Sequence, residues 1–123
     1  MPNIDIEENK DKFQKLCHMW IKRDGIDDLL NWLDTTDFYT APASTRFHLM
    51  CEGGLCQHSM NVFEQLCDEY KNEGMFDFKT QEDTQKIMES LAIVGLFHDV
   101  CKADFYKLTT RNVKDEYGNW TKV

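Results

Sequence analysis

Two segments of helical length, residues 55–72 and 80–102, each place a histidine on an apolar face. In the later segment, apolar positions at helical spacing lead to His98, and Asp99 follows directly. In the earlier segment, His58 falls within the apolar stripe. The two stripes are formed by Leu55, Val62, Leu66 and Tyr70 and by Ile87, Leu91 and Val94. A buried, unpartnered His-Asp pair is costly, so we expect the helices to pack side by side and bring His58, His98 and Asp99 together.

This set of side chains predicts a metal site. Two imidazoles and a carboxylate are a common ligand set for divalent metals. An ion held by His58, His98 and Asp99 would also compensate the cost of burying the carboxylate. We therefore expect one divalent ion, which can be Mn, Fe, Mg, Co, Ni or Zn. Lys102 follows His98 by four residues, and a continuous helix would keep it on the same side.

The remainder of the chain predicts an all-α domain. Apolar spacing indicates helices over about 7–22 and 26–34, which gives a bundle of about four to five helices in one domain, residues 1–123. Thr80 is expected to cap the last long helix, with Asp83 three residues on. β-formers flank "DEYGN", so a short hairpin is expected over 105–123. Between the second and third helices, Phe38 and Tyr39 in the long connection 35–54 are expected to be buried, as are Phe47, Leu49 and Met50.

Charge and composition indicate which binding partners and which cellular location to expect for the chain. A net charge of −8 disfavours long nucleic acids, whose binding depends on basic contacts to phosphate. No apolar run reaches the roughly 20 residues that span a bilayer, and the acidic start is not a secretory signal. We expect no membrane association and a cytoplasmic location. The five cysteines are odd in number and irregularly spaced, which favours reduced thiols.

Three stretches resemble one family. "GGLCQHSMNV" (53–62) and "FHDVCK" (97–102) resemble the two opening motifs of the HD-domain superfamily of metal-dependent phosphohydrolases, which have a helical fold. "DFYTAPASTRFHLMCEGGL" (37–55) resembles a subgroup of these hydrolases that is common in bacteria and their phages. The resemblance covers roughly residue 25 to the end. It implies that His58 is the family's first histidine and that His98 and Asp99 are its later His-Asp pair.

The resemblance also implies an activity and a substrate class. It implies hydrolysis of a phosphate ester, in a nucleotide or a related small phosphorylated molecule. Asp99 would bind the metal and orient a water, and Lys102 would stabilise charge on the phosphate. Arg46 is the candidate for a bidentate grip on phosphate. His48 could donate a hydrogen bond to the substrate or to the leaving oxygen.

The chain departs from the family pattern at one point. The last aspartate of the pattern, which lies on a further helix, has no match here, so the chain resembles the N-terminal portion of a longer pattern. An alternative is therefore a catalytically incomplete module that binds metal, nucleotide or a protein partner without turnover. In the longer family pattern, further helices would cover apolar surface on the helices present here. Without them this surface is exposed, which predicts a homo-oligomer. A further alternative is a structural zinc module that uses Cys51, Cys56 and His58.

Overall fold

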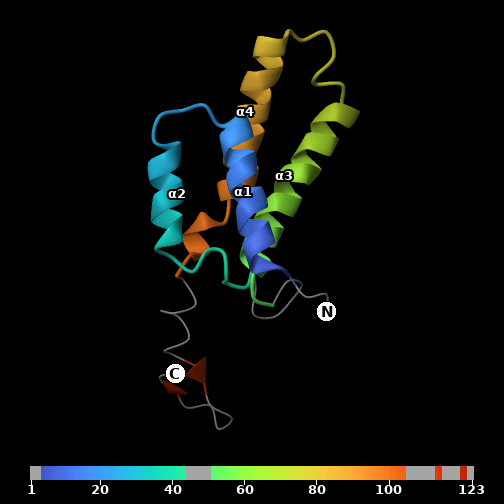
Figure 1. Cartoon of the computed structure of the whole chain (residues 1–123). Helices are drawn as coiled ribbons and strands as arrows, with labels where there is room; N and C mark the ends of the chain where they lie inside the picture. The colour runs from blue at the N-terminus through green and yellow to red at the C-terminus, as the bar shows by residue number, and fades with distance from the viewer. Residues whose placement is uncertain (1–3, 44–50, 105–112, 115–119, 122–123) are drawn as a thin grey trace.

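Four antiparallel α-helices form the body of the part of the chain that the structure describes. The computed structural model describes residues 4–43, 51–104, 113–114 and 120–121. Within them lie α1 (Ile6–Trp20), α2 (Ile26–Asp34), α3 (Gly54–Asn72), α4 (Gln81–Phe97) and the short 3₁₀ turn η1 (Val100–Lys102). The helices run alternately up and down (Figure 1), so α3 begins and α4 ends at the same, lower end of the bundle. The expected all-α class is confirmed.

The C-terminal hairpin is described only in part. The two-residue strands β1 (Val113–Lys114) and β2 (Trp120–Thr121) pair antiparallel, with Val113 opposite Thr121. The rest of the expected hairpin, 105–123, lies outside the described residues, so the hairpin as a whole stays a prediction. Among the described helices, none combines the length and the apolar character that crossing a bilayer requires.

Local signals account for where the helices begin. The Asp5 carboxylate accepts the Glu8 amide at 3.0 Å and caps α1, where Glu7 and Glu8 add negative charge to the first turn. The Thr80 hydroxyl accepts the Asp83 amide at 3.1 Å, which confirms the expected cap of α4. The bounds of α2 match those expected from the apolar spacing.

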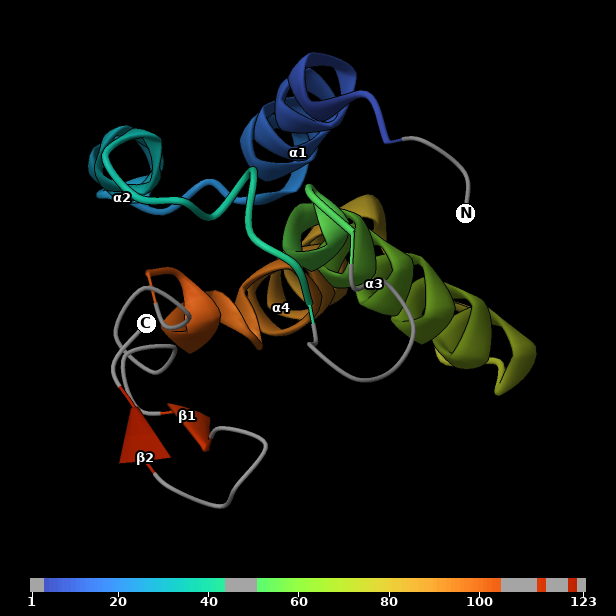
Figure 2. The same cartoon turned by 90° about the horizontal axis from the view of Figure 1, so that it is seen from below.

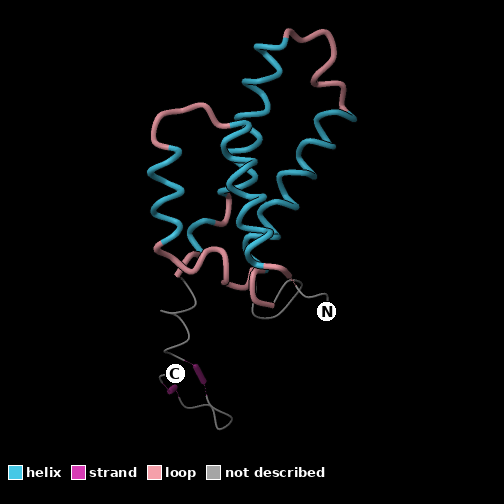
Figure 3. The backbone as a smooth tube through the Cα atoms, in the orientation of Figure 1, coloured by secondary structure: helices cyan, strands magenta, loops and turns pink. Residues whose placement is uncertain are grey.

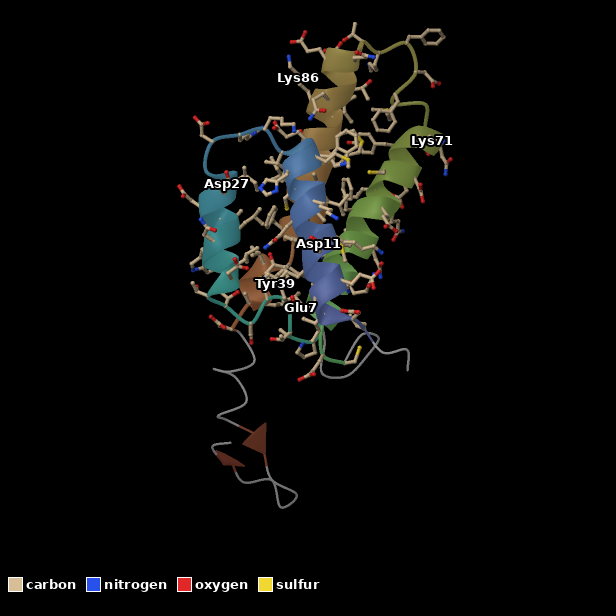
Figure 4. The ribbon with its side chains drawn as sticks, in the orientation of Figure 1. Glu7, Asp11, Asp27, Tyr39, Lys71 and Lys86 are labelled. Carbon is tan, nitrogen blue, oxygen red and sulfur yellow. The ribbon has the colours of Figure 1, made fainter. Side chains whose placement is uncertain are left out.

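Aromatic rings fill the centre of the core. The Phe13 ring of α1 is fully buried and lies 5.0 Å from Phe38, 5.9 Å from Tyr39 and 5.6 Å from Phe97, between ring centroids. Phe38 and Tyr39 belong to residues 37–43, which we call the strap. The strap leads from the lower end of α2 toward the start of α3 (Figure 3), and Tyr39 lies beside α1 in Figure 4. The expected burial of Phe38 and Tyr39 is confirmed. Phe47, Leu49 and Met50 lie outside the described residues.

Helices α3 and α4 pack closely against each other and lie side by side in both Figure 1 and Figure 2. A Cβ atom added at Gly95 of α4 would lie 2.7 Å from the Phe63 Cα and 2.9 Å from the Phe63 Cβ. Real Cβ atoms essentially never approach other atoms so closely, so only glycine allows this crossing.

The structure corrects two details of the expected fourth helix. The helix was expected to continue to about residue 102, but α4 ends at Phe97 and Asp99 adopts φ −112°, ψ 17° before η1. Val94, expected on the apolar stripe, is 59% exposed. The buried face of α4 instead consists of Leu91, Ala92, Gly95 and Leu96, because the glycine must face α3. His98 therefore lies at the rim of the bundle rather than deep inside it.

Two buried thiols make the stability of the fold sensitive to alkaline pH. Burial raises the pKa of Cys17 and of Cys56 from the ordinary 9.0 to about 12. The folded state then keeps protons that the unfolded state releases above pH 9, so this contribution to stability is full below pH 9 and is lost between about pH 9 and 12. Between pH 9 and 10 we expect the free energy of unfolding to fall by about 1 kcal/mol for each thiol.

Urea unfolding at the two pH values measures this effect. Cys56→Ala should show a smaller pH-dependent loss than the wild type, whereas Cys101→Ala, at an exposed position, should show the full loss. An identical pH dependence in the wild type and Cys56→Ala would contradict the role given to the buried thiol.

Candidate metal centre

Three side chains meet at the lower rim of the bundle. His58 lies in the second turn of α3, His98 caps the end of α4, and Asp99 follows. The His58 Nε2 atom is 3.3 Å from the His98 Nε2 atom and 3.4 Å from the Asp99 Oδ2 atom. The third side of the triangle, from His98 Nε2 to Asp99 Oδ2, measures 3.1 Å. The three residues that the sequence predicted as ligands are thus brought together, and we call them the triad.

A backbone hydrogen bond fixes the role of the His98 ring. Its Nδ1 atom lies 2.8 Å from the carbonyl oxygen of Gly95. A carbonyl can only accept, so a neutral ring carries its proton on Nδ1 and directs the Nε2 lone pair at the triad. This second contact is the kind that orients ligand histidines in metal sites.

The triad fits a cation. Neutral His98 then presents an acceptor at Nε2, 3.1 Å from a carboxylate oxygen that is also an acceptor, so a positive charge between them is favourable. A point about 2.1 Å from all three atoms lies roughly 0.9 Å out of their plane, and about 2.0–2.2 Å is the usual length of metal bonds to nitrogen and oxygen. The triad is therefore a group that could hold a metal ion.

Access from solvent is retained at the triad. The side chains of His58, His98 and Asp99 are 24%, 27% and 20% exposed. Three protein ligands and an open side are the arrangement that leaves positions for water and substrate in catalytic metal sites.

Lys102 lies beside the triad. Its Nζ atom is 3.5 Å from Asp99 Oδ2 and donates a hydrogen bond of 3.1 Å to the carbonyl oxygen of Ala43. The expected proximity of Lys102 to the pair is thus found, although it arises from the η1 turn rather than from a continuous helix. The other two predicted site residues, Arg46 and His48, lie outside the described residues, three and five positions after Ala43.

Sequence reasoning missed two backbone groups of this site. One is the Gly95 carbonyl, which orients His98, and the other is the Ala43 carbonyl, which holds Lys102. No sequence signal marks either group, because a carbonyl is common to every residue.

The structural zinc module is wrong for the described residues. Cys56 is fully buried in the core, and its thiol lies 3.8 Å from the carbonyl oxygen of Asn9. His58, which would complete that module, belongs to the triad instead. Within the part of the chain that the structure describes, the triad is the group of His, Cys, Asp and Glu side chains close enough to share an ion.

Comparisons with protein-family profiles, with characterised proteins and with solved structures found no match for this chain.

Proposed function

We propose that this protein is a divalent-metal-dependent phosphohydrolase that acts on a nucleotide or a related small phosphorylated molecule. The observation that carries the proposal is the triad, whose three ligand atoms lie 3.1–3.4 Å from one another with a lysine at its edge. The motifs around the triad supply the reaction class by their resemblance to HD-type phosphohydrolases.

Each described residue has a distinct part in this proposal. His58, His98 and Asp99 hold the ion, and the Gly95 carbonyl keeps the His98 lone pair directed at it. A divalent ion bound there polarises a phosphoryl oxygen and lowers the pKa of a bound water toward neutrality. The Lys102 ammonium, 35% exposed, is placed to attract an anionic group that enters beside Asp99.

The proposed substrate contacts continue along the chain from Ala43. Arg46 is proposed to grip phosphate through its planar guanidinium, and His48 to donate a hydrogen bond to the substrate or to the leaving oxygen. The proposal also places the protein in the reducing cytoplasm, in keeping with five cysteines that form no disulfide. Association with a second copy is proposed as well, since Phe78 is fully exposed and Val94 is 59% exposed.

Metal-dependent phosphate release tests the function. The untagged protein is freed of metal with a chelator, reloaded with Mn²⁺, Co²⁺ or Zn²⁺, and given a panel of nucleoside mono-, di- and triphosphates. Phosphate release should require the ion and should fall by at least about 100-fold in His98→Ala, which removes a ligand. His18→Ala is the matched control, because His18 lies on the exposed surface of α1 and contacts Asp27.

The same experiment separates the alternative. One ion bound per chain, lost in His98→Ala, together with no release from any substrate would identify a module that binds without turnover. Equal metal content in the wild type and His98→Ala would contradict the metal centre itself.

A further inference from the structure

The strap is tied at its first residue to the chain just after the triad. The Asp37 amide donates to the Asp104 Oδ1 atom at 3.1 Å, and the Asp104 amide donates to the Asp37 Oδ1 atom through a short hydrogen bond. Each carboxylate therefore holds the backbone of the other residue. We call this reciprocal pair the Asp37–Asp104 clamp. Asp104 is two residues after Lys102, so the clamp fixes the segment that follows Asp99.

The strap is also tied to the start of α3. The Thr40 carbonyl accepts the Gly53 amide and the Ala41 carbonyl accepts the Leu55 amide, both at 2.9 Å. Leu55 is three residues before His58. A third hydrogen bond, from Lys102 Nζ to the Ala43 carbonyl oxygen, connects the end of the strap to the lysine that lies beside the triad. The strap thus connects the helix that carries His58 to the segment that carries Asp99.

Burial makes this connection stiff. Phe38, Tyr39, Ala41 and Ala43 are each no more than 5% exposed, and the rings of Phe38 and Tyr39 contact Phe13 in the core. A strap held in the core cannot slide to follow a displaced η1 turn, because close-packed interiors resist such shifts. The clamp therefore ties the segment that follows Asp99 to a part of the chain that is held in the core.

The backbone at Asp104 points to the same conclusion. Asp104 has φ +60°, in the left-handed region that non-glycine residues seldom adopt. Aspartate and asparagine tolerate this region best after glycine. Asp104 thus combines a left-handed backbone with both hydrogen bonds of the clamp, since its amide donates to Asp37 and its carboxylate accepts from Asp37.

We propose that Asp104 and Asp37 are positioning residues that set the metal affinity of the triad. Neither residue contacts the ion in this proposal. They hold η1 against the strap and thereby keep Asp99 Oδ2 within 3.4 Å of His58 Nε2. The inference rests on the metal centre of the proposed function, but it does not require that the protein hydrolyse phosphate esters.

Metal affinity of the whole 123-residue chain tests the clamp through variants of Asp104. Zn²⁺ affinity is measured by competition with a coloured chelator, and the site geometry by the visible absorption of the Co²⁺ form. Asp104→Gly removes the carboxylate and accepts φ +60° without strain. We expect its Zn²⁺ affinity to fall by about 10- to 100-fold and its Co²⁺ spectrum to change. Asp104→Asn keeps an oxygen acceptor and tolerates the left-handed backbone, so it should retain affinity within about threefold.

Two further variants test whether the two halves of the clamp act together and whether a lost negative charge alone changes the metal affinity. Asp37→Ala breaks the other half of the clamp, so the double variant with Asp104→Gly should lose little more affinity than either single variant. Asp68→Ala removes one negative charge from the exposed face of α3 and should bind Zn²⁺ like the wild type.

The outcomes separate the two proposals. Wild-type affinity and spectrum in Asp104→Gly, with the wild type binding metal, would overturn the positioning role alone. A wild type that binds neither Zn²⁺ nor Co²⁺ would overturn the metal centre and the clamp's role in it. Lost affinity in Asp104→Gly, retained in Asp104→Asn while thermal unfolding shows both variants folded, is the expected result.

Discussion

Replacing Gly95 by valine is expected to destabilise the fold by about 3 kcal/mol or more and to abolish metal binding at the triad. A Cβ atom at this position would lie 2.7 Å from the Phe63 backbone, and valine adds two further methyl groups. Overpacking against backbone cannot be relieved by rotating a side chain, so α3 and α4 must separate. The separation would occur one turn before His98, where the two histidines come within 3.3 Å.

Urea unfolding and Zn²⁺ affinity measure the two parts of this expectation. Gly95→Ala should give an intermediate loss, since the single methyl group overlaps less and alanine favours the helix by about 1 kcal/mol. Ser90→Val is the control, because it adds the same side chain at an exposed position of the same helix. Wild-type stability in Gly95→Val would show that the helices do not cross this closely.

Truncating Phe13 to alanine is expected to cost about 3–5 kcal/mol of folding free energy. The ring is fully buried and contacts rings from the strap and from the end of α4. Removing it leaves a cavity where three segments meet, and the stiff neighbouring rings fill such a space poorly. A domain of this size has only about 5–15 kcal/mol in total, so the variant should unfold at a much lower urea concentration.

A second substitution on α1 calibrates this result. Met19→Ala removes a side chain that is 54% exposed and should cost less than about 1 kcal/mol. Phe13→Leu keeps most of the apolar volume and should fall between the two. Equal losses in Phe13→Ala and Met19→Ala would contradict the placement of Phe13 at the centre of the core.

The sequence by itself determined the features that depend on near neighbours along the chain. Helical spacing gave the bounds of α2 and the start of α3 to within a residue, and Thr80 marked the start of α4. The same spacing selected His58 and His98, because each shares the apolar face of a helix that must pack, and Asp99 was selected because it follows His98 directly. These signals are local, since caps and periodicity act within one or two turns of a helix.

Only the tertiary structure decided how these parts meet. The triad joins residues 40 positions apart, Lys102 reaches Ala43 across 59, and the clamp joins Asp37 to Asp104 across 67. The exposure of Val94 and the rim position of His98 likewise follow from Gly95 facing Phe63, which no periodicity reveals. Such contacts depend on which helix faces pack and how closely the backbones approach, and spacing along the chain carries no information about either.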